Sequence, residues 1–475
     1  MSHDYDLVIL GGGIGGYSAA IRAATYGMKT AIVEQEKIGG TCLHQGCIPT
    51  KSFIESAHKF RQTKTLAHFG VEAGETKLNF KKVQTRTKNI VQTLHHGLLA
   101  LIKKNKIDVF YGKGRILGAS IFSPIPGTIS VEYANGEENA MLHPKHILIA
   151  TGSAPKTVPG LDVDDEHIMD SEGALRMETL PESILIIGGG VIGMEWASML
   201  ADFGVNVTVV EAGESILPGF DLSIVKEVEK QLAAKNITIF KSATVQPETL
   251  EKENGISIDI LEKETGQTQT ILAEKLLVAV GRTGNIHNIG LENTEIVTTD
   301  GFIEVNKFYQ TKETHIYAVG DVIGGKQLAH AAANEGIKAV EHMAGEVPQE
   351  INERMIPACV YIHPEIASIG LTEEEARAKD LAIKVGNFPF LANGKALIQG
   401  ESNGFVKVIE DEETNDILGI HMIGPGVTDL IGEASLAQTM DATPWEISQA
   451  IHPHPSLSEA LWEASLATDG KQIHF

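Results

Sequence analysis

Two cysteines five positions apart are the residues of this chain whose types and spacing most directly imply chemistry. Cys42 and Cys47 lie in the segment GGTCLHQGCIPTK, Gly39 to Lys51. Two cysteines are most often buried thiols, and a metal site would need more ligands than this segment offers. The chain has only three cysteines, which argues against a disulfide-stapled secreted scaffold and favours a catalytic disulfide in a reducing compartment. The pair therefore predicts redox chemistry with a thiolate as the nucleophile.

A second candidate site lies far along the chain. The segment HPHPSLSE supplies His452, His454 and Glu459, and its two prolines stiffen the backbone. Taken alone, such a segment is more often a structural loop with surface histidines. A histidine oriented by a carboxylate is also a general-base arrangement. Together with the cysteine pair, the segment predicts that His454 is a base and that Glu459 orients it.

An internal repeat indicates which elements position the cysteines. The segment YDLVILGGGIGGYSAAIRAATYGMKTAIVE, Tyr5 to Glu34, recurs at a constant offset as ESILIIGGGVIGMEWASMLADFGVNVTVVE, Glu182 to Glu211. Each copy has the pattern of a buried strand, a glycine-rich turn, a helix ended by a glycine, and a second strand ending in glutamate. Two Rossmann-like units are therefore predicted, and the cysteines closely follow the first of them.

The repeated motif predicts dinucleotide binding. In the first copy Gly11 permits the tight turn, Gly13 lets the backbone approach a pyrophosphate, and Gly16 allows close helix packing. Glu34 is placed to accept hydrogen bonds from ribose hydroxyls. The second copy repeats the arrangement with Gly188, Gly190, Gly193 and Glu211. One such motif is weak evidence, but two that share strand, glycines, helix end and acid predict that two dinucleotides bind.

A third motif is THIYAVGDVIGG, in which an apolar strand ends at Gly320 and Asp321. Asp321 could bind a polyol, and the helix that follows could stabilise negative charge on a reduced ring. Without the other motifs, an ordinary strand-ending turn would explain it equally well. The remaining histidines, including His95 and His96, have no metal-ligand spacing, and no metal site is predicted.

The order of these patterns predicts an α/β chain, and its length suggests about three domains. Two Rossmann-like domains are expected at 1–150 and 151–280, and a further strand and helix around Gly320 and Asp321 follow them at 281–350. Alternating runs such as GFVKVIE and DILGIHMIG, followed by helical patterns, predict a C-terminal α+β domain at 351–475.

Composition excludes several classes of partner. The chain has 39 basic and 62 acidic residues, and its net charge of −23 repels nucleic acid and anionic lipid surfaces. No run of 18 apolar residues occurs, and the start lacks the pattern of a secretory signal. A cytoplasmic protein that binds neither nucleic acid nor membrane is expected.

Together the motifs resemble those of the pyridine nucleotide-disulfide oxidoreductases over essentially the whole chain. The order of domains in that family matches the order of motifs here. The resemblance implies an enzyme with FAD and NAD as cofactors. It also implies that residues 1–150 bind FAD, 151–280 bind NAD, 281–350 complete the FAD site and 351–475 form a dimer interface.

The same resemblance adds cofactor contacts to those of the two glycine motifs. Further flavin-contacting positions are Lys51, Gly114, Thr151, Gly152, Asp321 and Ala329. Further positions that border the NAD are Glu195, Val245 and Gly281. Lys51 and Glu195 match a pair near the flavin and the nicotinamide, where a partly buried ion pair would be costly unless it is functional.

The cysteine and histidine segments look most like the branch of the family that oxidises dihydrolipoamide. The implied partners are a second copy of the chain and the lipoyl and subunit-binding domains of a 2-oxo acid dehydrogenase acyltransferase. The implied base His454 would face Cys42 of the other subunit, with Cys47 nearest the flavin. The stretch Ile116–Leu142 is similar to enzymes of branched-chain 2-oxo acid complexes.

Two alternatives remain at this point, and three residues depart from the pattern of the family. A reductase of the glutathione or mercuric type would use NADPH, for which arginine rather than Glu211 is expected. A non-catalytic flavin-binding scaffold subunit would not need both the cysteine pair and the histidine–glutamate pair. The departures are Ser456, Gly284 and Ile362, at positions where the family usually has threonine, proline and threonine.

A disulfide between the two cysteines requires a distorted helix. Residues five apart in a regular helix have Cα atoms about 8.7 Å apart. A disulfide tolerates at most about 7 Å. We therefore predict an interruption of the helix near its start, with Gly46 as the site of relief.

Overall fold

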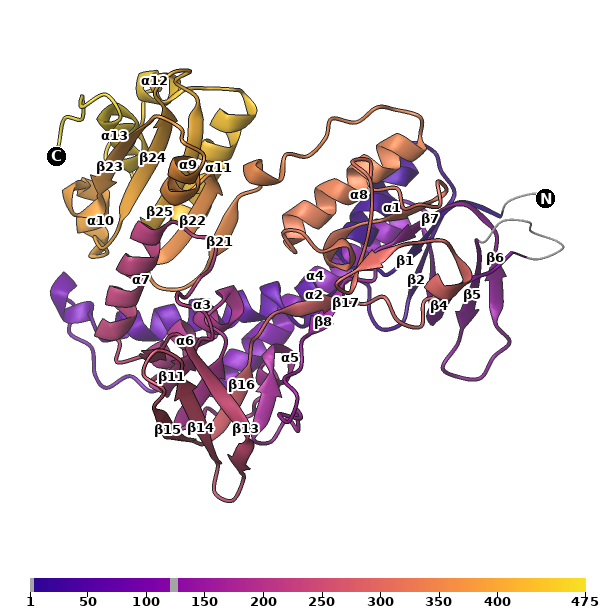
Figure 1. Cartoon of the computed structure of the whole chain (residues 1–475), viewed down its shortest axis with the longest axis horizontal. Helices are drawn as coiled ribbons and strands as arrows, with labels where there is room; N and C mark the ends of the chain where they lie inside the picture. Colours follow the sequence, from indigo (N-terminus) through magenta and orange to yellow (C-terminus); the bar gives the residue numbers. More distant parts are fainter. Residues whose placement is uncertain (1–3, 120–126) are drawn as a thin grey trace. The chain divides into compact units, whose positions relative to one another are not determined.

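The computed structural model describes residues 4–119 and 127–475, whose elements are labelled in Figure 1. The chain forms two compact units, each assembled from three segments. The first unit comprises Met1–Ser52, Gln84–Lys156 and Arg282–Ile351, and the second comprises Phe53–Val83, Thr157–Gly281 and Asn352–Phe475. Part of the stretch Ile116–Leu142, on which the resemblance to branched-chain enzymes depends, lies outside the described residues. The boundaries of the four predicted domains stay predictions.

The first unit is built around a parallel sheet of five strands in the order β20-β7-β1-β2-β3. Its strands are β1 (Tyr5–Leu10), β2 (Thr30–Glu34), β3 (Asp108–Tyr111), β7 (Pro144–Ile149) and β20 (Ile316–Ala318). Along β1, Leu7 and Ile9 join one hydrophobic cluster while Val8 and Leu10 join another. Both faces of this sheet are therefore buried, which explains why its strands are continuously apolar.

Helices and short strands complete the first unit. Helix α1 (Ile14–Thr25) packs against α8 (Ala329–Met343), and a Cβ atom at Gly336 would lie 2.5 Å from the carbonyl oxygen of Gly15. The other elements are α2 (Gly40–His44), β4 (Lys113–Leu117), β5 (Thr128–Glu132), β6 (Ala140–Leu142), β8 (Ser153–Pro155), β17 (Arg282–Gly284), η2 (Leu291–Asn293), β18 (Thr298–Thr299), β19 (Phe302–Ile303) and η3 (Gly320–Ile323). Helices α3 (Cys47–Thr63) and α4 (Phe80–Lys104) each contribute residues to both units.

The second unit contains another five-stranded parallel sheet, in the order β12-β11-β10-β16-β9. Its strands and helices are β9 (Ile168–Asp170), α5 (Ser171–Ala174), β10 (Ser183–Ile187), α6 (Val191–Phe203), β11 (Asn206–Val210), α7 (Leu222–Ala234), β12 (Thr238–Phe240) and β16 (Lys275–Val278). An antiparallel sheet of β13 (Ala243–Glu251), β14 (Ile256–Glu262) and β15 (Thr268–Ala273) is inserted before β16. Two Rossmann-like sheets are thus present, as the repeat predicts.

The C-terminal segment of the second unit folds around an antiparallel sheet in the order β21-β22-β25-β24-β23. Its strands are β21 (Ala358–Val360), β22 (Glu365–Gly370), β23 (Ile383–Pro389), β24 (Phe405–Asp411) and β25 (Ile417–Gly424). Its helices are α9 (Glu373–Ala378), α10 (Gly394–Gln399), α11 (Val427–Thr439), α12 (Pro444–Gln449) and α13 (Glu459–Ala467), with short turns η4 (Glu353–Met355) and η5 (Phe390–Ala392). Turn η1 (Leu66–Phe69) lies in the first segment of the unit. The predicted α+β fold of this region is confirmed.

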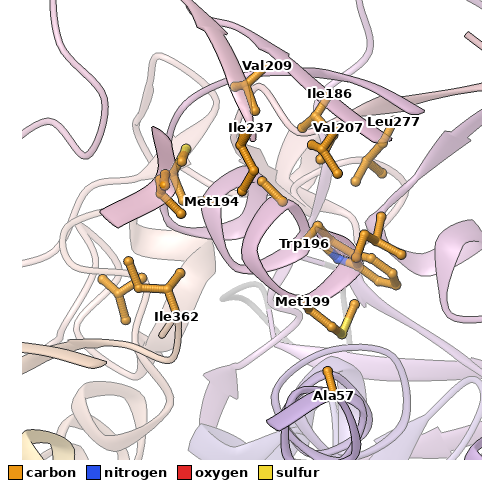
Figure 2. Packing of buried hydrophobic residues seen from close by; sticks show 14 of the residues in the cluster. Ala57, Ile186, Met194, Trp196, Met199, Val207, Val209, Ile237, Leu277 and Ile362 are labelled. Atoms are coloured by element: carbon orange, nitrogen blue, oxygen red, sulfur yellow. The ribbon is translucent and has the colours of Figure 1, made fainter. Parts of the chain in front are cut away.

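A large hydrophobic core holds the three segments of the second unit together. Trp196, on α6, is 1% exposed and belongs to a cluster that includes Ala57 from α3, Ile186 from β10 and Ile362 from the C-terminal segment (Figure 2). Burying large apolar side chains contributes about 1.5–3 kcal/mol each. Residues distant in sequence therefore stabilise the Rossmann-like sheet of this unit.

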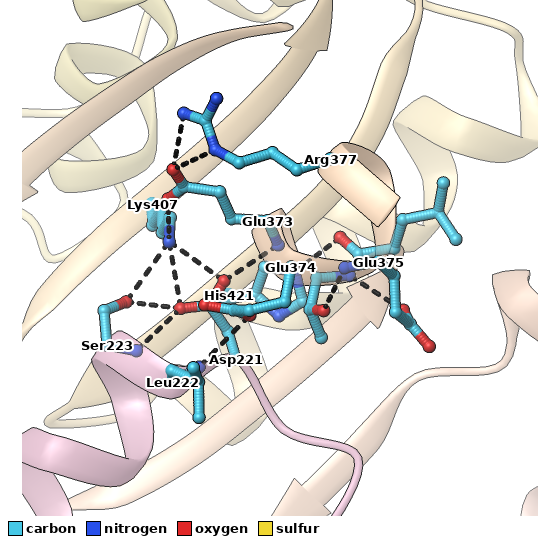
Figure 3. Close-up of polar contacts among 11 residues, drawn as sticks. Asp221, Leu222, Ser223, Glu373, Glu374, Glu375, Arg377, Lys407 and His421 are labelled. Atoms are coloured by element: carbon cyan, nitrogen blue, oxygen red, sulfur yellow. Dashed lines mark hydrogen bonds and ion pairs between the residues drawn. The ribbon is translucent and has the colours of Figure 1, made fainter. Parts of the chain in front are cut away.

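A buried ionic cluster also links two of these segments, Thr157–Gly281 and Asn352–Phe475 (Figure 3). Asp221, the N-cap of α7, is 0% exposed, and both of its oxygens lie 2.9 Å from Nζ of Lys407 on β24. Glu373 also pairs with Lys407, at 2.6 Å. Burial alone would raise the pKa of Asp221, but hydrogen bonds from Ser223, Lys407 and the Glu373 amide lower it to about 2.

Removing the cation of this cluster should destabilise the protein strongly. Lys407→Met leaves Asp221 buried without a counter-charge, and we expect the free energy of unfolding to fall by about 3–5 kcal/mol at pH 7. Chemical denaturation measures the effect. The control Lys230→Met breaks a pair in which the lysine is 73% exposed, and should change stability by about 0.5 kcal/mol or less.

The same cluster predicts that the stability of the folded protein depends on pH. Because the pKa of folded Asp221 is below its ordinary value of 3.8, its contribution is fully present above about pH 5 and is lost as the pH falls toward 2. An unfolding midpoint for Lys407→Met equal to that of the wild type would contradict the assigned role of the cluster.

Candidate functional site

The two glycine-rich turns have nearly the same geometry. Gly11 and Gly188 have φ values of +102° and +109°, in the left-handed region that favours glycine. A Cβ atom at Gly11 would lie 2.3 Å from the carbonyl oxygen of Ala150, and one at Gly188 would lie 2.3 Å from that of Ala279. Neither turn can accept another residue without moving its backbone, so the repeat in sequence is also a repeat in structure.

The third glycine of each motif lies against its own turn. A Cβ atom at Gly16 would lie 2.0 Å from the carbonyl oxygen of Gly11, and one at Gly193 would lie 2.0 Å from that of Gly188. Only glycine permits this approach. Helices α1 and α6 therefore begin directly beside the strands that precede them.

The second glycine of each motif faces open space at a helix N-terminus. Gly13 and Gly190 are the N-caps of α1 and α6, and neither helix has a side-chain cap among the described residues. Within the described chain, no atom lies within 4 Å of a Cβ atom built at either glycine. The amides at a helix N-terminus carry partial positive charge and attract phosphate groups. Both turns therefore fit the pyrophosphate of a dinucleotide.

The two glutamates that follow the turns are held in matching ways. Glu34 accepts hydrogen bonds from the amides of Gly12 and Glu36, each at 2.8 Å. Glu211 accepts them from Gly189 and Gly213, each at 2.6 Å. An ionised carboxylate has about four acceptor positions, so each glutamate can still bind ribose hydroxyls. The backbone thus fixes the orientation of both carboxylates.

The cysteine pair lies where one helix stops and the next begins. Helix α2 ends at His44 and α3 begins at Cys47, and Gln45 between them has φ −137° and ψ 10°. The interruption predicted near Gly46 is confirmed. In this structure Cys42 and Cys47 are thiols with a hydrogen bond between their side chains.

The groups around Cys42 together oppose its ionisation. The hydrogen bond with Cys47 is the main reason that the pKa of Cys42 lies above its ordinary value, and burial acts in the same direction. The ammonium of Lys51 opposes this rise, while the carboxylate of Asp321 adds to it. Adjacent thiols resist double ionisation because the second negative charge is repelled by the first. Lys51 and Asp321 are therefore both near enough to influence the cysteine pair.

Asp321 is tied to the short strands β8 and β17. Its carboxylate accepts a hydrogen bond of 2.5 Å from Oγ of Ser153. The same Oγ accepts one of 2.7 Å from Nε of Arg282, whose Nη2 also donates to the Ser153 carbonyl at 2.8 Å. Arg282 could not be predicted from the sequence, because nothing in the spacing links it to Asp321.

The other predicted flavin contacts also lie in the first unit. Thr151 donates from Oγ1 to the carbonyl of Asn285 at 2.8 Å, and Gly152 has φ +70°. A Cβ atom at Gly114 would lie 2.6 Å from Cδ2 of Leu10, so this part of β4 passes close to β1. Ala329 is the first residue of α8. None of these four residues carries an ionisable side chain.

The residues predicted to border the NAD lie in the second unit. Glu195 is 3% exposed and accepts a hydrogen bond of 3.0 Å from the amide of Tyr361. Gly281 has φ +105°, and Val245 is half-buried on β13. The predicted pairing of Glu195 with Lys51 stays a prediction, because the two residues belong to different units.

The candidate base lies in the loop before α13, and Glu459 is the first residue of that helix. Nδ1 of His454 lies 2.9 Å from Oε1 of Glu459, and Oε2 of Glu459 accepts a hydrogen bond of 2.8 Å from the amide of Ser456. Burial raises the pKa of Glu459, but these two hydrogen bonds lower it below its ordinary value. The side chain of His454 is 79% exposed. The imidazole is thus oriented by an ionised carboxylate and open to a reactant, although it belongs to a different unit from the cysteines.

The three departures from the pattern of the family have local explanations. Ser456 uses its amide to hold Glu459, which any residue except proline could do. A Cβ atom at Gly284 would lie 2.6 Å from the carbonyl oxygen of Gly301, so glycine suits this backbone. Ile362 is 3% exposed in the core of the second unit. The reacting groups are unaffected.

Two dinucleotide-binding sheets, a cysteine pair beside the first of them and a histidine–glutamate pair define a class of protein: a nucleotide-dependent thiol–disulfide oxidoreductase. Comparison with known proteins agrees. Residues 5–336 match the family model described as pyridine nucleotide-disulphide oxidoreductase, and residues 356–465 match the dimerisation domain of the same family. The chain belongs to the pyridine nucleotide-disulphide oxidoreductase family, and its cofactors are FAD and NAD.

Similar proteins cover the chain from end to end. A dihydrolipoyl dehydrogenase of Bacillus subtilis is 58% identical over 475 residues and covers 100% of both chains. A dihydrolipoyl dehydrogenase of Zymomonas mobilis is 39% identical with the same coverage. Among solved structures, LpdA from Mycobacterium tuberculosis has a TM-score of 0.88 and 27% identity, covering 97% of this chain and 98% of that one.

Across residues 4–119 and 127–475, no group of three or more histidine, cysteine or acidic side chains could hold a metal ion. In the same residues, none of the helices is long and apolar enough to cross a membrane.

Proposed function

We propose that this protein is a dihydrolipoyl dehydrogenase, which oxidises dihydrolipoyl groups through the Cys42–Cys47 disulfide and FAD and reduces NAD+ to NADH. The observation that carries the proposal is the cysteine pair at the break between α2 and α3, shortly after the first βαβ unit with its glycine-rich turn. Full-length similarity to proteins of this name supports the same assignment.

The base acts through a defined nitrogen. Because Nδ1 of His454 faces the carboxylate of Glu459, Nδ1 carries the hydrogen and Nε2 keeps a lone pair. Nε2 takes the proton from one thiol of dihydrolipoamide, and the charge of Glu459 stabilises the imidazolium that results. His454 therefore converts the substrate thiol to the thiolate that reacts.

The thiolate then exchanges with the protein disulfide. It attacks Sγ of Cys42, the bond between Cys42 and Cys47 breaks, and Cys47 leaves as a thiolate that Lys51 helps to stabilise. The second substrate thiol attacks the mixed disulfide and releases oxidised lipoamide, so the electron pair remains on the two cysteines. Bound FAD and NAD supply the electron-transfer chemistry that restores the disulfide, with NAD+ as the final acceptor.

The chain has residues suited to holding both cofactors. For FAD we propose Gly11, Gly13, Gly16, Glu34, Lys51, Gly114, Thr151, Gly152, Asp321 and Ala329. For NAD we propose Gly188, Gly190, Gly193, Glu195, Glu211, Val245 and Gly281. The open helix N-termini and the oriented glutamates are the features that support these two sets.

The proposed partners follow from the proposed activity. The match to a dimerisation domain supports a homodimer. The dihydrolipoyl group would be carried by the lipoyl domain of a 2-oxo acid dehydrogenase acyltransferase, whose subunit-binding domain would hold the enzyme in the complex. Reversible dithiol chemistry suits a reducing compartment, and we infer a location in the cytoplasm.

Turnover of dihydrolipoamide with NAD+, compared with reduction of glutathione disulfide by NADPH, tests the assignment. The proposal expects the first reaction and at most a trace of the second. Titration of thiols before and after addition of NADH separates the enzyme from a flavin-binding scaffold, because only the enzyme gains two thiols per chain. Efficient glutathione reduction or an unchanged thiol count would overturn the proposal.

Nucleotide preference gives a further prediction. The carboxylate of Glu211 should repel the 2′-phosphate of NADP+, and like charges in contact cost several kcal/mol. We expect kcat/KM to favour NAD+ over NADP+ by about 100-fold or more. Steady-state kinetics with both nucleotides measures this ratio, and equal efficiencies would contradict the role of Glu211.

A further inference from the structure

A second histidine–glutamate pair lies beside the candidate base. Nε2 of His452 lies 2.8 Å from Oε1 of Glu433, which is on α11. The side chain of His452 is 7% exposed, whereas that of His454 is 79% exposed. The two histidines of the segment HPHPSLSE therefore have different environments, and the buried one takes no part in the mechanism proposed above.

The ring of His452 has an acceptor at both nitrogens. Its Nδ1 lies 3.0 Å from the carbonyl oxygen of Ala450, the C-cap of α12. One side chain thus joins the end of α12 to the middle of α11. Rotation about the side-chain bonds of His452 would lose both contacts. The two contacts therefore fix the position of the backbone at residue 452.

The fixed position of the backbone at His452 also restricts the position of the base, His454. Pro453 has a fixed φ and separates His452 from His454 by a single stiff residue. Downstream, the amide of Ser456 is bound by Glu459 at 2.8 Å. Glu459 orients the ring of His454 and the backbone after it, while the contacts of His452 hold the backbone before it. The segment that carries the base is therefore anchored on both sides.

We propose that His452 is a positioning residue for the base His454, acting through its bonds to Glu433 and Ala450. The inference rests on the proposed function, since it assigns His454 the role of base. A displacement of about 1 Å in a reacting group can cost about 100-fold in rate. The contacts of His452 are suited to prevent such a displacement.

Three substitutions separate the two bonds. His452→Asn places an amide nitrogen near the position of Nδ1 and retains the bond to Ala450. His452→Gln places one near Nε2 and retains the bond to Glu433. His452→Leu removes both. We expect kcat for dihydrolipoamide oxidation to fall about 100-fold in the leucine variant and about 10-fold in each of the others.

A double-mutant cycle gives a sharper test. Glu433→Leu should match His452→Asn, because both remove the same bond, and the combination should lower kcat no further than either change alone. The readouts are kcat and KM for dihydrolipoamide, transfer from NADH to an artificial one-electron acceptor, the dimer content and the melting temperature. The positioning role predicts that only kcat falls substantially, with acceptor reduction, dimer and melting temperature close to wild type.

Two outcomes would overturn the inference. One is lipoamide turnover in His452→Leu within about twofold of wild type. The other is a parallel loss of acceptor reduction and melting temperature in all variants, which would make His452 merely structural. If the leucine variant does not fold, the asparagine and glutamine variants decide the matter. Failure of the wild type itself to oxidise dihydrolipoamide would refute the proposed function instead. That outcome is distinct from failure of the positioning role of His452, in which the wild type is active.

Discussion

Replacing His454 by glutamine should lower the rate of dihydrolipoamide oxidation by about two to four orders of magnitude, the usual range for loss of a general base. Glutamine can still accept a hydrogen bond, but it cannot take a proton from a thiol at neutral pH. The structure gives the imidazole an orienting carboxylate at 2.9 Å and leaves it open on its other side. Steady-state kinetics with dihydrolipoamide and NAD+ measures the loss.

A second assay shows whether the loss is chemical. Transfer of electrons from NADH to an artificial one-electron acceptor does not require the base, so it should survive in His454→Gln. Glu459→Gln should show the same pattern with a smaller loss, because the base remains but its orientation and charge stabilisation are weakened. Near-normal lipoamide turnover in His454→Gln would remove this residue from the mechanism.

Mixing two inactive variants should restore activity. If Cys42 and Cys47 of one subunit face His454 and Glu459 of its partner, a dimer of one Cys42→Ser chain and one His454→Gln chain has one complete site. Equal amounts of the two chains form mixed dimers half of the time. We therefore expect about one quarter of wild-type activity after dissociation and reassembly.

The alternative gives the opposite result. A chain whose C-terminal region completed its own site would contain one defect in every site, so every mixture would stay inactive. Mixing two preparations that carry the same substitution serves as the control for the reassembly procedure. Activity well below one quarter, with mixed dimers demonstrated by mass, would argue against a shared site.

Much of the site could be predicted because its signals are local in the sequence. The glycine turns, the two glutamates and the cysteine pair each lie within motifs of a few tens of residues, and a backbone constraint explains the first and the third glycine of each turn. The interruption at Gly46 followed from helix geometry alone, since residues five apart in a regular helix cannot form a disulfide. The two Rossmann-like units were accessible for the same reason, because each repeat predicts its own βαβ unit.

Contacts between distant segments could not be predicted. Glu433 lies on α11 whereas His452 lies in the loop after α12, and Lys407 lies on a strand far in sequence from Asp221. No spacing in the sequence connects either pair. The grouping of residues 53–83 with the second unit depends on burial of side chains such as Ala57 in the core around Trp196. Such contacts are set by tertiary packing rather than by a periodic pattern.

The amides that hold Glu211 have a consequence for engineering. Gly189 donates to Oε2 of this carboxylate and Gly213 donates to Oε1, each at 2.6 Å. A small residue at position 211 would leave these two N–H groups without an acceptor, so they would be free to donate to a phosphate. A change of preference from NAD+ to NADP+ therefore requires few substitutions. The two donors already point toward position 211, and an added arginine would need to supply only the positive charge.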